Sequence, residues 1–424
     1  MAEPSVKRFV FLSFFLYGML PSPSWAAYTP ILSGKEVGTD LEDLKRLRGS
    51  GEEADSLLEF FKHRTHLGVG VEERYDTNIL LDRRDAERED YVSTLESRAL
   101  FADPRGALLY GIEGEVYAYR YHILTKNAID ENLRSFIDFD PGGRIQFHSE
   151  YYLVVANSLV LGADGGDILR RSTDFQRSVE HTGIGSLRYA LNETNALASK
   201  VDYSVYDDQT VNDAATDRRR FHATLDLDHD LTPTWILFGG YSFQDTFIPG
   251  EKTKNTKIHS GRFGVRHDLR EGEKERLEAT LELQRSEFHV GTTATDLSFT
   301  GSWTHELSPR TSFKLGYEDT HGTSFSAGRL RYRNRKPSVT ILYQLTPLMD
   351  LSGGGEYSLQ TSGSKDAVPG STATAEKNTT LNLFAELKWQ IREQTRIDLK
   401  YKYGRSPTRD YTAQDTELKI EMLF

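Results

Sequence analysis

Hydrophobic and polar residues alternate with a period of two from residue 65 to the end of the chain. In LNLFAELKWQIR, residues 381–392, the odd positions are apolar and the even positions are mostly polar. The segments FHATLDLD (221–228), LEATLELQ (277–284) and RIDLKYKY (396–403) show the same alternation. Because successive side chains of a strand point to opposite faces, each segment predicts a strand with one apolar and one polar face. Repeated segments of about ten residues with this pattern are typical of transmembrane β-strands.

Short turn sequences separate the alternating segments in a regular order. Their Pro, Gly, Asn and Asp residues suit tight hairpin connections. Longer polar connections, such as LGADGGDILRRSTD (161–174), lie between successive tight turns. This order is that of barrels with short periplasmic turns and long extracellular loops. The tight turns span residues 103–106, 141–144, 191–195, 231–234, 270–275, 308–311, 346–350 and 392–395.

The turns also predict the number of strands. Eight hairpins, a first strand in HLGVGVEERY (66–75) and a last strand in TELKIEMLF (416–424) give eighteen. The weakest segment is RSFIDFD (134–140), and sixteen strands is the alternative. A soluble sandwich would have to bury faces that are too charged for a protein interior. We therefore predict an all-β fold, a transmembrane antiparallel up-and-down β-barrel of about eighteen strands in the outer membrane.

The last strand has an apolar face that ends on an aromatic residue. Glu417, Lys419 and Glu421 lie on its other face, which we expect to line a wet lumen. Such a strand resembles the C-terminal signal that outer-membrane barrels present to the barrel-assembly machinery. The partners that this predicts are outer-membrane lipid and that machinery. The apolar face consists of Leu418, Ile420, Met422 and Phe424.

The first 64 residues predict a leader and a short extension. Lys7 and Arg8 precede an apolar run and then small residues, which is the order of a secretory signal peptide with cleavage after Ala26. Residues 27–64 are polar with two helix-like pieces, and we expect a periplasmic N-terminal extension that is partly helical or disordered. The predicted barrel then occupies residues 65–424.

Composition narrows the class of protein further. The 424 residues include no cysteine, which excludes disulfides, a thiol nucleophile and cysteine-bound metal. The mean hydropathy is −0.54, and no apolar run after residue 20 is long enough for a helical membrane span. The formal net charge of −11 argues against nucleic acid as a partner.

Motifs for catalysis or cofactor binding are missing from the sequence. It contains no G-x-S-x-G elbow, H-E-x-x-H helix, P-loop or dinucleotide fingerprint. His63 and His66 lack a third ligand, and DLDHD (226–230) lacks the glycine and downstream Glu of a calcium loop. We therefore predict no enzyme activity, no catalytic residues, no cofactor and no metal site.

Charged residues on the polar faces suggest a pore lining. In an eighteen-strand barrel, the strand containing DLDHD and the strand containing RIDLKYKY are nine apart and lie on opposite walls. The sequence therefore predicts a transverse field across the periplasmic half of a channel, with ordinary solvated lumen charge as the alternative. The acidic side would comprise Asp226, Asp228, Glu278 and Glu282, and the basic side Lys388, Arg392, Arg396, Lys400 and Lys402.

VGVEERYDTNILL, residues 69–81, resembles the opening of a family of outer-membrane β-barrel porins associated with exopolysaccharide export. The matching residues are Tyr75, Asp76, Asn78 and Ile79, and Thr77 replaces an Asp that is common in the family. The resemblance implies a conduit for secreted polysaccharide, with polysaccharide and periplasmic export components as partners.

The functional prediction is a channel for hydrophilic solutes, and the resemblance implies that it is a conduit for secreted exopolysaccharide. The alternative is a structural or adhesive barrel that acts through extracellular loops. The loops in question are residues 159–175 and 362–379.

Overall fold

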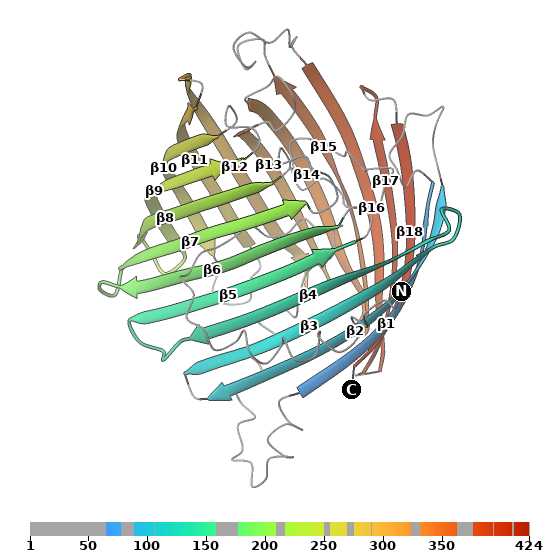
Figure 1. Cartoon of the computed structure of the whole chain (residues 1–424). Helices are drawn as coiled ribbons and strands as arrows, with labels where there is room; N and C mark the ends of the chain where they lie inside the picture. Colours follow the sequence, from blue (N-terminus) through green and yellow to red (C-terminus); the bar gives the residue numbers. More distant parts are fainter. Residues whose placement is uncertain are drawn as a thin grey trace, which may run out of the picture.

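Eighteen antiparallel strands make up the part of the chain that the computed structural model describes, which comprises residues 65–77, 89–105, 107–157, 177–208, 217–249, 255–268, 275–289, 291–323, 331–362, 376–392, 394–408 and 411–423. The strands follow one another around a single sheet, which Figure 1 shows from the side. They are β1 (Thr65–Asp76), β2 (Asp90–Arg105), β3 (Leu108–Tyr121), β4 (Lys126–Phe139), β5 (Ile145–Ala156), β6 (Ser178–Ala190), β7 (Asn195–Asp208), β8 (Arg218–Asp230), β9 (Trp235–Phe247), β10 (Thr256–Asp268), β11 (Glu275–Phe288), β12 (Thr293–Ser308), β13 (Thr311–Thr323), β14 (Arg331–Thr346), β15 (Met349–Ser362), β16 (Glu376–Arg392), β17 (Thr395–Ser406) and β18 (Tyr411–Leu423).

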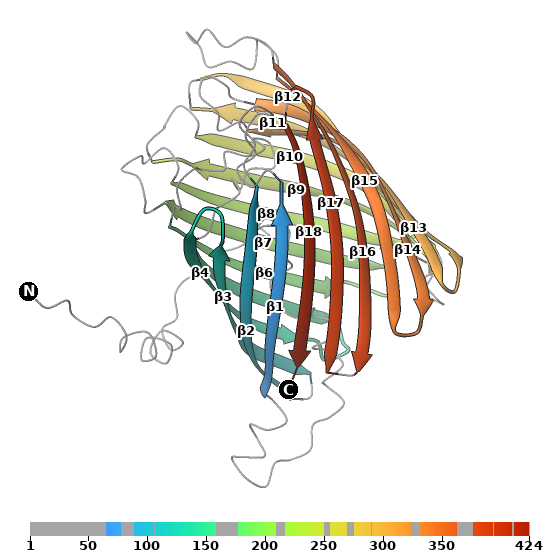
Figure 2. The same cartoon turned by 90° about the vertical axis from the view of Figure 1, so that its right-hand side faces the viewer.

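The sheet closes on itself into an up-and-down barrel. Each strand pairs antiparallel with the next, and β1 pairs with both β2 and β18. In the closing pair the register runs from Gly68 opposite Leu423 to Asp76 opposite Asp415. Figure 2 shows β1 and β18 side by side at this seam. The predicted all-β barrel is confirmed with eighteen strands rather than sixteen, and the weak segment RSFIDFD belongs to β4.

The eight predicted tight turns fall between successive strands at one end of the barrel, where β1 begins and β18 ends, and most of the turn at 270–275 lies outside the described residues. The LNETN turn shows why these residues form a turn. The side-chain oxygen of Asn192 accepts hydrogen bonds from the backbone N–H groups of Thr194 and Asn195, at 3.0 and 2.9 Å. Asparagine side chains stabilise turns in this way because they satisfy backbone donors that have no strand partner.

The connections at the opposite end, which we call the long-loop end, are less uniform than predicted. Three of them, β3–β4, β11–β12 and β17–β18, join strands that are only four residues apart. The β3–β4 turn is held by Asp90, whose carboxylate accepts the backbone N–H groups of Ile123 and Leu124. Such anchoring allows the strands to pair up to their last residues, so the expectation of a long connection between every two tight turns was wrong.

Apolar side chains cover the outer face of the barrel and polar side chains its inner face. On β8, Leu225 and Leu227 are 49% and 47% exposed, whereas Asp226 and Asp228 lie on the opposite, inner face. Leu418, Ile420 and Met422 of β18 lie on the outer face and are exposed, although their predicted role in barrel assembly stays a prediction. Exposed apolar rows of this kind are stable where lipid surrounds the barrel.

Several sequence predictions fall outside the described residues. These are the signal peptide at 1–26, the extension at 27–64, and Phe424 of the C-terminal signal. Most of the two candidate adhesive loops is also outside. Residues 362 and 376–379 of the second candidate loop are described, and they belong to β15 and β16 rather than to a loop.

Candidate functional site: the inner wall of the barrel

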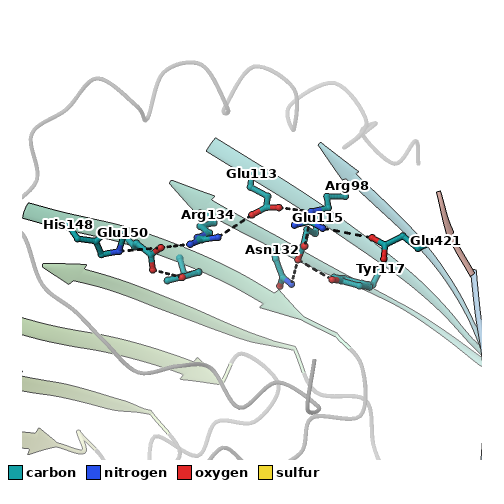
Figure 3. Close-up of polar contacts among 10 residues, drawn as sticks. Arg98, Glu113, Glu115, Tyr117, Asn132, Arg134, His148, Glu150 and Glu421 are labelled. Atoms are coloured by element: carbon teal, nitrogen blue, oxygen red, sulfur yellow. Dashed lines mark hydrogen bonds and ion pairs between the residues drawn. The ribbon is translucent and has the colours of Figure 1, made fainter. Parts of the chain in front are cut away.

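A ladder of charges with alternating sign crosses the inner faces of β2 to β5 (Figure 3). The Nε atom of Arg98 on β2 lies 2.5 Å from Oε1 of Glu113 on β3, and Glu113 lies 3.6 Å from a guanidinium nitrogen of Arg134 on β4. Arg134 forms an ion pair with Glu150 on β5, and Nε2 of His148 lies 3.4 Å from the same carboxylate. Arg98, Glu113, Arg134 and Glu150 therefore each have a partner of opposite sign on a neighbouring strand.

The ladder is deeply buried, which makes its pairing obligatory. Glu113, Arg134 and Glu150 are 1%, 5% and 8% exposed. A buried charge is strongly destabilising unless an opposite charge and hydrogen bonds compensate it. Glu115 is also buried, and its carboxylate accepts hydrogen bonds from the Tyr117 hydroxyl and the Asn132 amide, at 3.0 and 3.3 Å. The inner wall at these strands is thus a fixed polar network.

An ion pair also bridges the seam where the barrel closes. Nζ of Lys419 on β18 lies 2.6 Å from Oε2 of Glu96 on β2, so the pair passes over β1, the strand between them. Gly70 of β1 pairs in register with both Glu96 and Glu421. A Cβ at Gly70 would lie 3.2 Å from the Glu96 carboxylate and 3.3 Å from Cε of Lys419. The glycine of the first strand leaves room for this bridge.

Carboxylates outnumber basic side chains on the inner faces of β18 and β1 to β5, which we call the acidic sector. Side chains alternate between the two faces along each strand, and on this basis the described residues of the acidic sector include twelve inward carboxylates and five inward basic side chains. The inner faces of the other described strands carry both signs in near-equal numbers. The carboxylates are Glu72, Asp76, Asp90, Glu96, Glu113, Glu115, Asp130, Asp138, Glu150, Asp415, Glu417 and Glu421. The basic residues are Arg74, Arg98, Lys126, Arg134 and Lys419.

The predicted acidic residues of β8 and β11 lie on the inner face, each close to an arginine. Asp226 accepts a hydrogen bond of 2.7 Å from Nε of Arg262 on β10, across Gly240 of β9. A Cβ at Gly240 would overlap the Asp226 carboxylate, so glycine is required beneath this ion pair. Three further pairs complete this side: Asp228 with Arg188 at 3.5 Å, Glu278 with Arg266 at 3.5 Å, and Glu282 opposite Arg262 in register.

Four of the five predicted basic residues of β16 and β17 are likewise close to carboxylates. Arg396 forms an ion pair of 2.7 Å with Asp398, and Lys402 lies 3.6 Å from Asp415. β8 and β17 are nine strands apart, as predicted, so the structure does not bring the two sets together. The remaining members are Lys388, 3.5 Å from Glu386; Lys400, opposite Glu417 in register; and Arg392, at the end of β16.

Local pairing weakens any field that these two predicted sets could produce across the lumen. Opposite charges within 4 Å largely cancel each other at the distance of the far wall. The transverse field between β8 and β17 stays a prediction, whereas the acidic sector is the larger charge asymmetry of the described wall. Sequence reasoning missed it, although the signal was present. Counting inward charges strand by strand finds Glu72 and Asp76 on β1, and Glu113 and Glu115 on β3.

Two cavities lie along the inner wall, and the second reaches His148 at the end of the ladder. The first has a volume of 390 Å³ and is lined by strands β7 to β11, β13 and β14. The second has a volume of 510 Å³ and includes Asp138, Arg188 and Lys200. Hydroxyl and amide groups dominate the first cavity, together with a few charged side chains. Its lining includes Ser204, Arg218, Arg220, Ser242, Gln244, Gln284, Tyr332, Asn334 and Lys336.

Of the residues that carried the family resemblance, the structure describes Tyr75 and Asp76, which lie on opposite faces of β1. The Tyr75 hydroxyl donates a 2.6 Å hydrogen bond to Glu89, and this contact is exposed. Asp76 is buried on the inner face and accepts a 2.9 Å hydrogen bond from Arg74. Asn78 and Ile79 lie outside the described residues. The two described residues, Tyr75 and Asp76, therefore do not share a site.

Within the described ranges, no group of His, Asp and Glu side chains is arranged to hold a metal ion. No helix in the described part of the chain is long and apolar enough to cross a membrane.

A closed barrel with an apolar outside and a charged inside is the architecture of outer-membrane β-barrel proteins. No protein-family model matches the chain, and no curated protein matches it either. Among solved structures it is similar to the outer membrane protein opdK from Pseudomonas aeruginosa, with 10% identity over 85% of this chain and 98% of that chain, at a TM-score of 0.47. It is also similar to a BenF-like porin from Pseudomonas fluorescens Pf-5, with 9% identity over 85% of this chain and 98% of that chain, at a TM-score of 0.48.

Proposed function

We propose that the chain forms a water-filled channel in the outer membrane, through which hydrophilic solutes pass and cations pass more readily than anions. The acidic sector carries this proposal, because its carboxylates outnumber its basic side chains by twelve to five. An excess of one sign along a low-dielectric wall raises the local concentration of the opposite ion. Charged rings and walls set ion preference in channels by the same physics.

The width of the barrel supports passage of hydrated solutes. Barrels of about 16 to 18 strands are wide enough to leave an aqueous channel. The cavities of 390 and 510 Å³ give polar recesses along the inner wall. A secreted polysaccharide is a narrower cargo within this proposal. The sequence resemblance supports it, as do the hydroxyl and amide side chains of the first cavity, which can exchange hydrogen bonds with sugar hydroxyls.

The test is the reversal potential of the refolded protein in a planar bilayer under a salt gradient. We expect stable openings with a reversal potential of the sign that a cation-preferring channel gives. Replacing Glu417 and Glu421 with Gln should lower the preference, because both side chains belong to the acidic sector. Openings without cation preference, or with anion preference, would refute the ion selectivity. Absence of openings from correctly folded protein would refute the channel.

A matched control separates this effect from a general change in charge. Glu73 lies on the outer face of β1, where its carboxylate accepts a hydrogen bond from Ser93. Glu73→Gln removes one carboxylate from the strand that pairs with β18 without changing the lumen, and we expect an unchanged reversal potential. Addition of candidate polysaccharides to one side tests the narrower cargo, since a bound polymer would block the openings.

A further inference from the structure

Four basic side chains gather on the outer face of β14, β16 and β17 at the long-loop end, and we call them the outer basic patch. Its members are Arg333 and Arg335 on β14, Lys377 on β16 and Arg405 on β17. All four are separated by an even number of residues from exposed apolar positions of their own strands, which places them on the lipid-facing side. The side chains of Arg333 and Arg335 are 39% and 45% exposed.

The strand register places these residues close to one another. Arg333 pairs with Thr361 of β15, and Thr361 pairs with Lys377 of β16. Since neighbouring strands are about 4.8 Å apart, Arg333 and Lys377 lie about 10 Å from each other. Arg335 is the next outward-facing residue after Arg333 on β14. Arg405 of β17 pairs with Leu381 of β16, which is the second outward-facing residue after Lys377 on that strand.

One acidic side chain, Asp319 of β13, belongs to this patch and organises it. Arg333 donates two hydrogen bonds of 2.6 Å to the Asp319 carboxylate, and Nε of Arg335 lies 3.5 Å from it. The bidentate pair holds Arg333 in place, and the patch keeps an excess of three positive charges. The outer faces of β1, β4, β7 and β9 differ from the patch at the long-loop end. Their outward positions there include carboxylates, namely Glu73, Glu131, Asp207 and Asp245.

An apolar surface continues directly below the patch on the same strands. Val339 of β14, Tyr357 of β15 and Leu383 of β16 are outward-facing and exposed. A cationic patch above an apolar strip matches a lipid, with an anionic head group above hydrocarbon chains. Guanidinium and ammonium groups bind phosphate oxygens through charge-assisted hydrogen bonds.

We propose that the outer basic patch binds the phosphate groups of a phosphorylated glycolipid in the membrane leaflet on the long-loop side. The long loops of such barrels are extracellular, so this leaflet is the outer one. Basic clusters beside a membrane recognise anionic lipid head groups by charge. The patch faces lipid rather than the lumen, so this site is independent of the channel proposed above.

The experiment measures the lipid that remains bound to full-length barrel extracted from outer membranes in mild detergent. Native mass spectrometry and phosphate analysis give the amount of phosphorylated glycolipid per barrel. The variant carries Arg335→Gln, Lys377→Gln and Arg405→Gln, and leaves the Arg333–Asp319 pair intact. We expect it to retain about tenfold less glycolipid than the unmodified protein, since each basic residue near a membrane surface contributes substantially to anionic lipid binding.

The matched control removes three basic residues from the outer face at the same end of other strands, namely Arg219, Lys257 and Arg285. Heat-modifiable migration on gels verifies that both variants are folded. Retention should be unchanged in the control. The proposal would be overturned if the patch variant retained as much glycolipid as the unmodified protein. It would also be overturned if the patch variant and the control lost the same amount of glycolipid. Retention of phospholipid in place of glycolipid would overturn the assignment of the ligand.

Discussion

Replacing Glu113 with Gln removes the central charge of the ladder and should strongly destabilise the barrel. The Glu113 side chain is 1% exposed and lies between Arg98, at 2.5 Å, and Arg134, at 3.6 Å. Breaking a buried ion pair on one side costs about 3 to 5 kcal/mol, because the remaining charge stays buried. Glu150 still neutralises Arg134, and Glu115 lies 3.6 Å from Arg98, so we expect a loss near the lower end, about 3 kcal/mol.

The assay is reversible urea unfolding of the protein in lipid vesicles, followed by tryptophan fluorescence. Glu278→Gln is the matched control, since it makes the same chemical change in the same lumen. The Glu278 side chain is 35% exposed and lies 3.5 Å from Arg266, and an ion pair of this exposure contributes only about 0 to 1 kcal/mol. Equal losses in the two variants, or a loss below about 1 kcal/mol for Glu113→Gln, would show that burial does not determine the cost.

Two further experiments test the glycine beneath the Asp226–Arg262 pair and the bridge at the seam. Gly240→Ala should cost about 1 to 3 kcal/mol in the same unfolding assay, because the added methyl overlaps the Asp226 carboxylate. Gly261→Ala is the control and should be neutral or stabilising, because no atom lies within 4 Å of the added Cβ. Similar losses of stability for the two changes would contradict the predicted overlap at Gly240. A double-mutant cycle of Lys419→Met and Glu96→Gln should give a coupling energy of about 1 to 3 kcal/mol, and a value near zero would mean that the pair is not formed.

The fold could be predicted from the sequence because its signals are local. Alternation identifies each strand, and turn residues such as those at 191–195 identify the hairpins. With consecutive strands paired, the strand count and the opposite positions of β8 and β17 follow directly. The short β3–β4 turn was missed because the residue that anchors it, Asp90, lies on another strand, more than thirty residues earlier.

The charge pattern of the lumen could be predicted only in part. The inward face of each charged residue follows from alternation, as for Asp226 and Arg396. Its partner does not, because that depends on register and on glycines in the strands between. Arg262 is 36 residues from Asp226 and reaches it only because Gly240 has no side chain. The predicted acidic and basic walls are therefore locally paired, and the net asymmetry lies at β18 and β1 to β5.

The bridge between Lys419 and Glu96 has a consequence for the order of folding. Glu96 lies on the second strand and is 6% exposed, whereas its partner lies on the last described strand, which is synthesised long after it. A barrel that has not yet received its final strand therefore lacks the Lys419 partner of Glu96, which lies one strand in from the open edge. Docking of the final strand neutralises that carboxylate across the first strand and favours the complete ring over shorter ones.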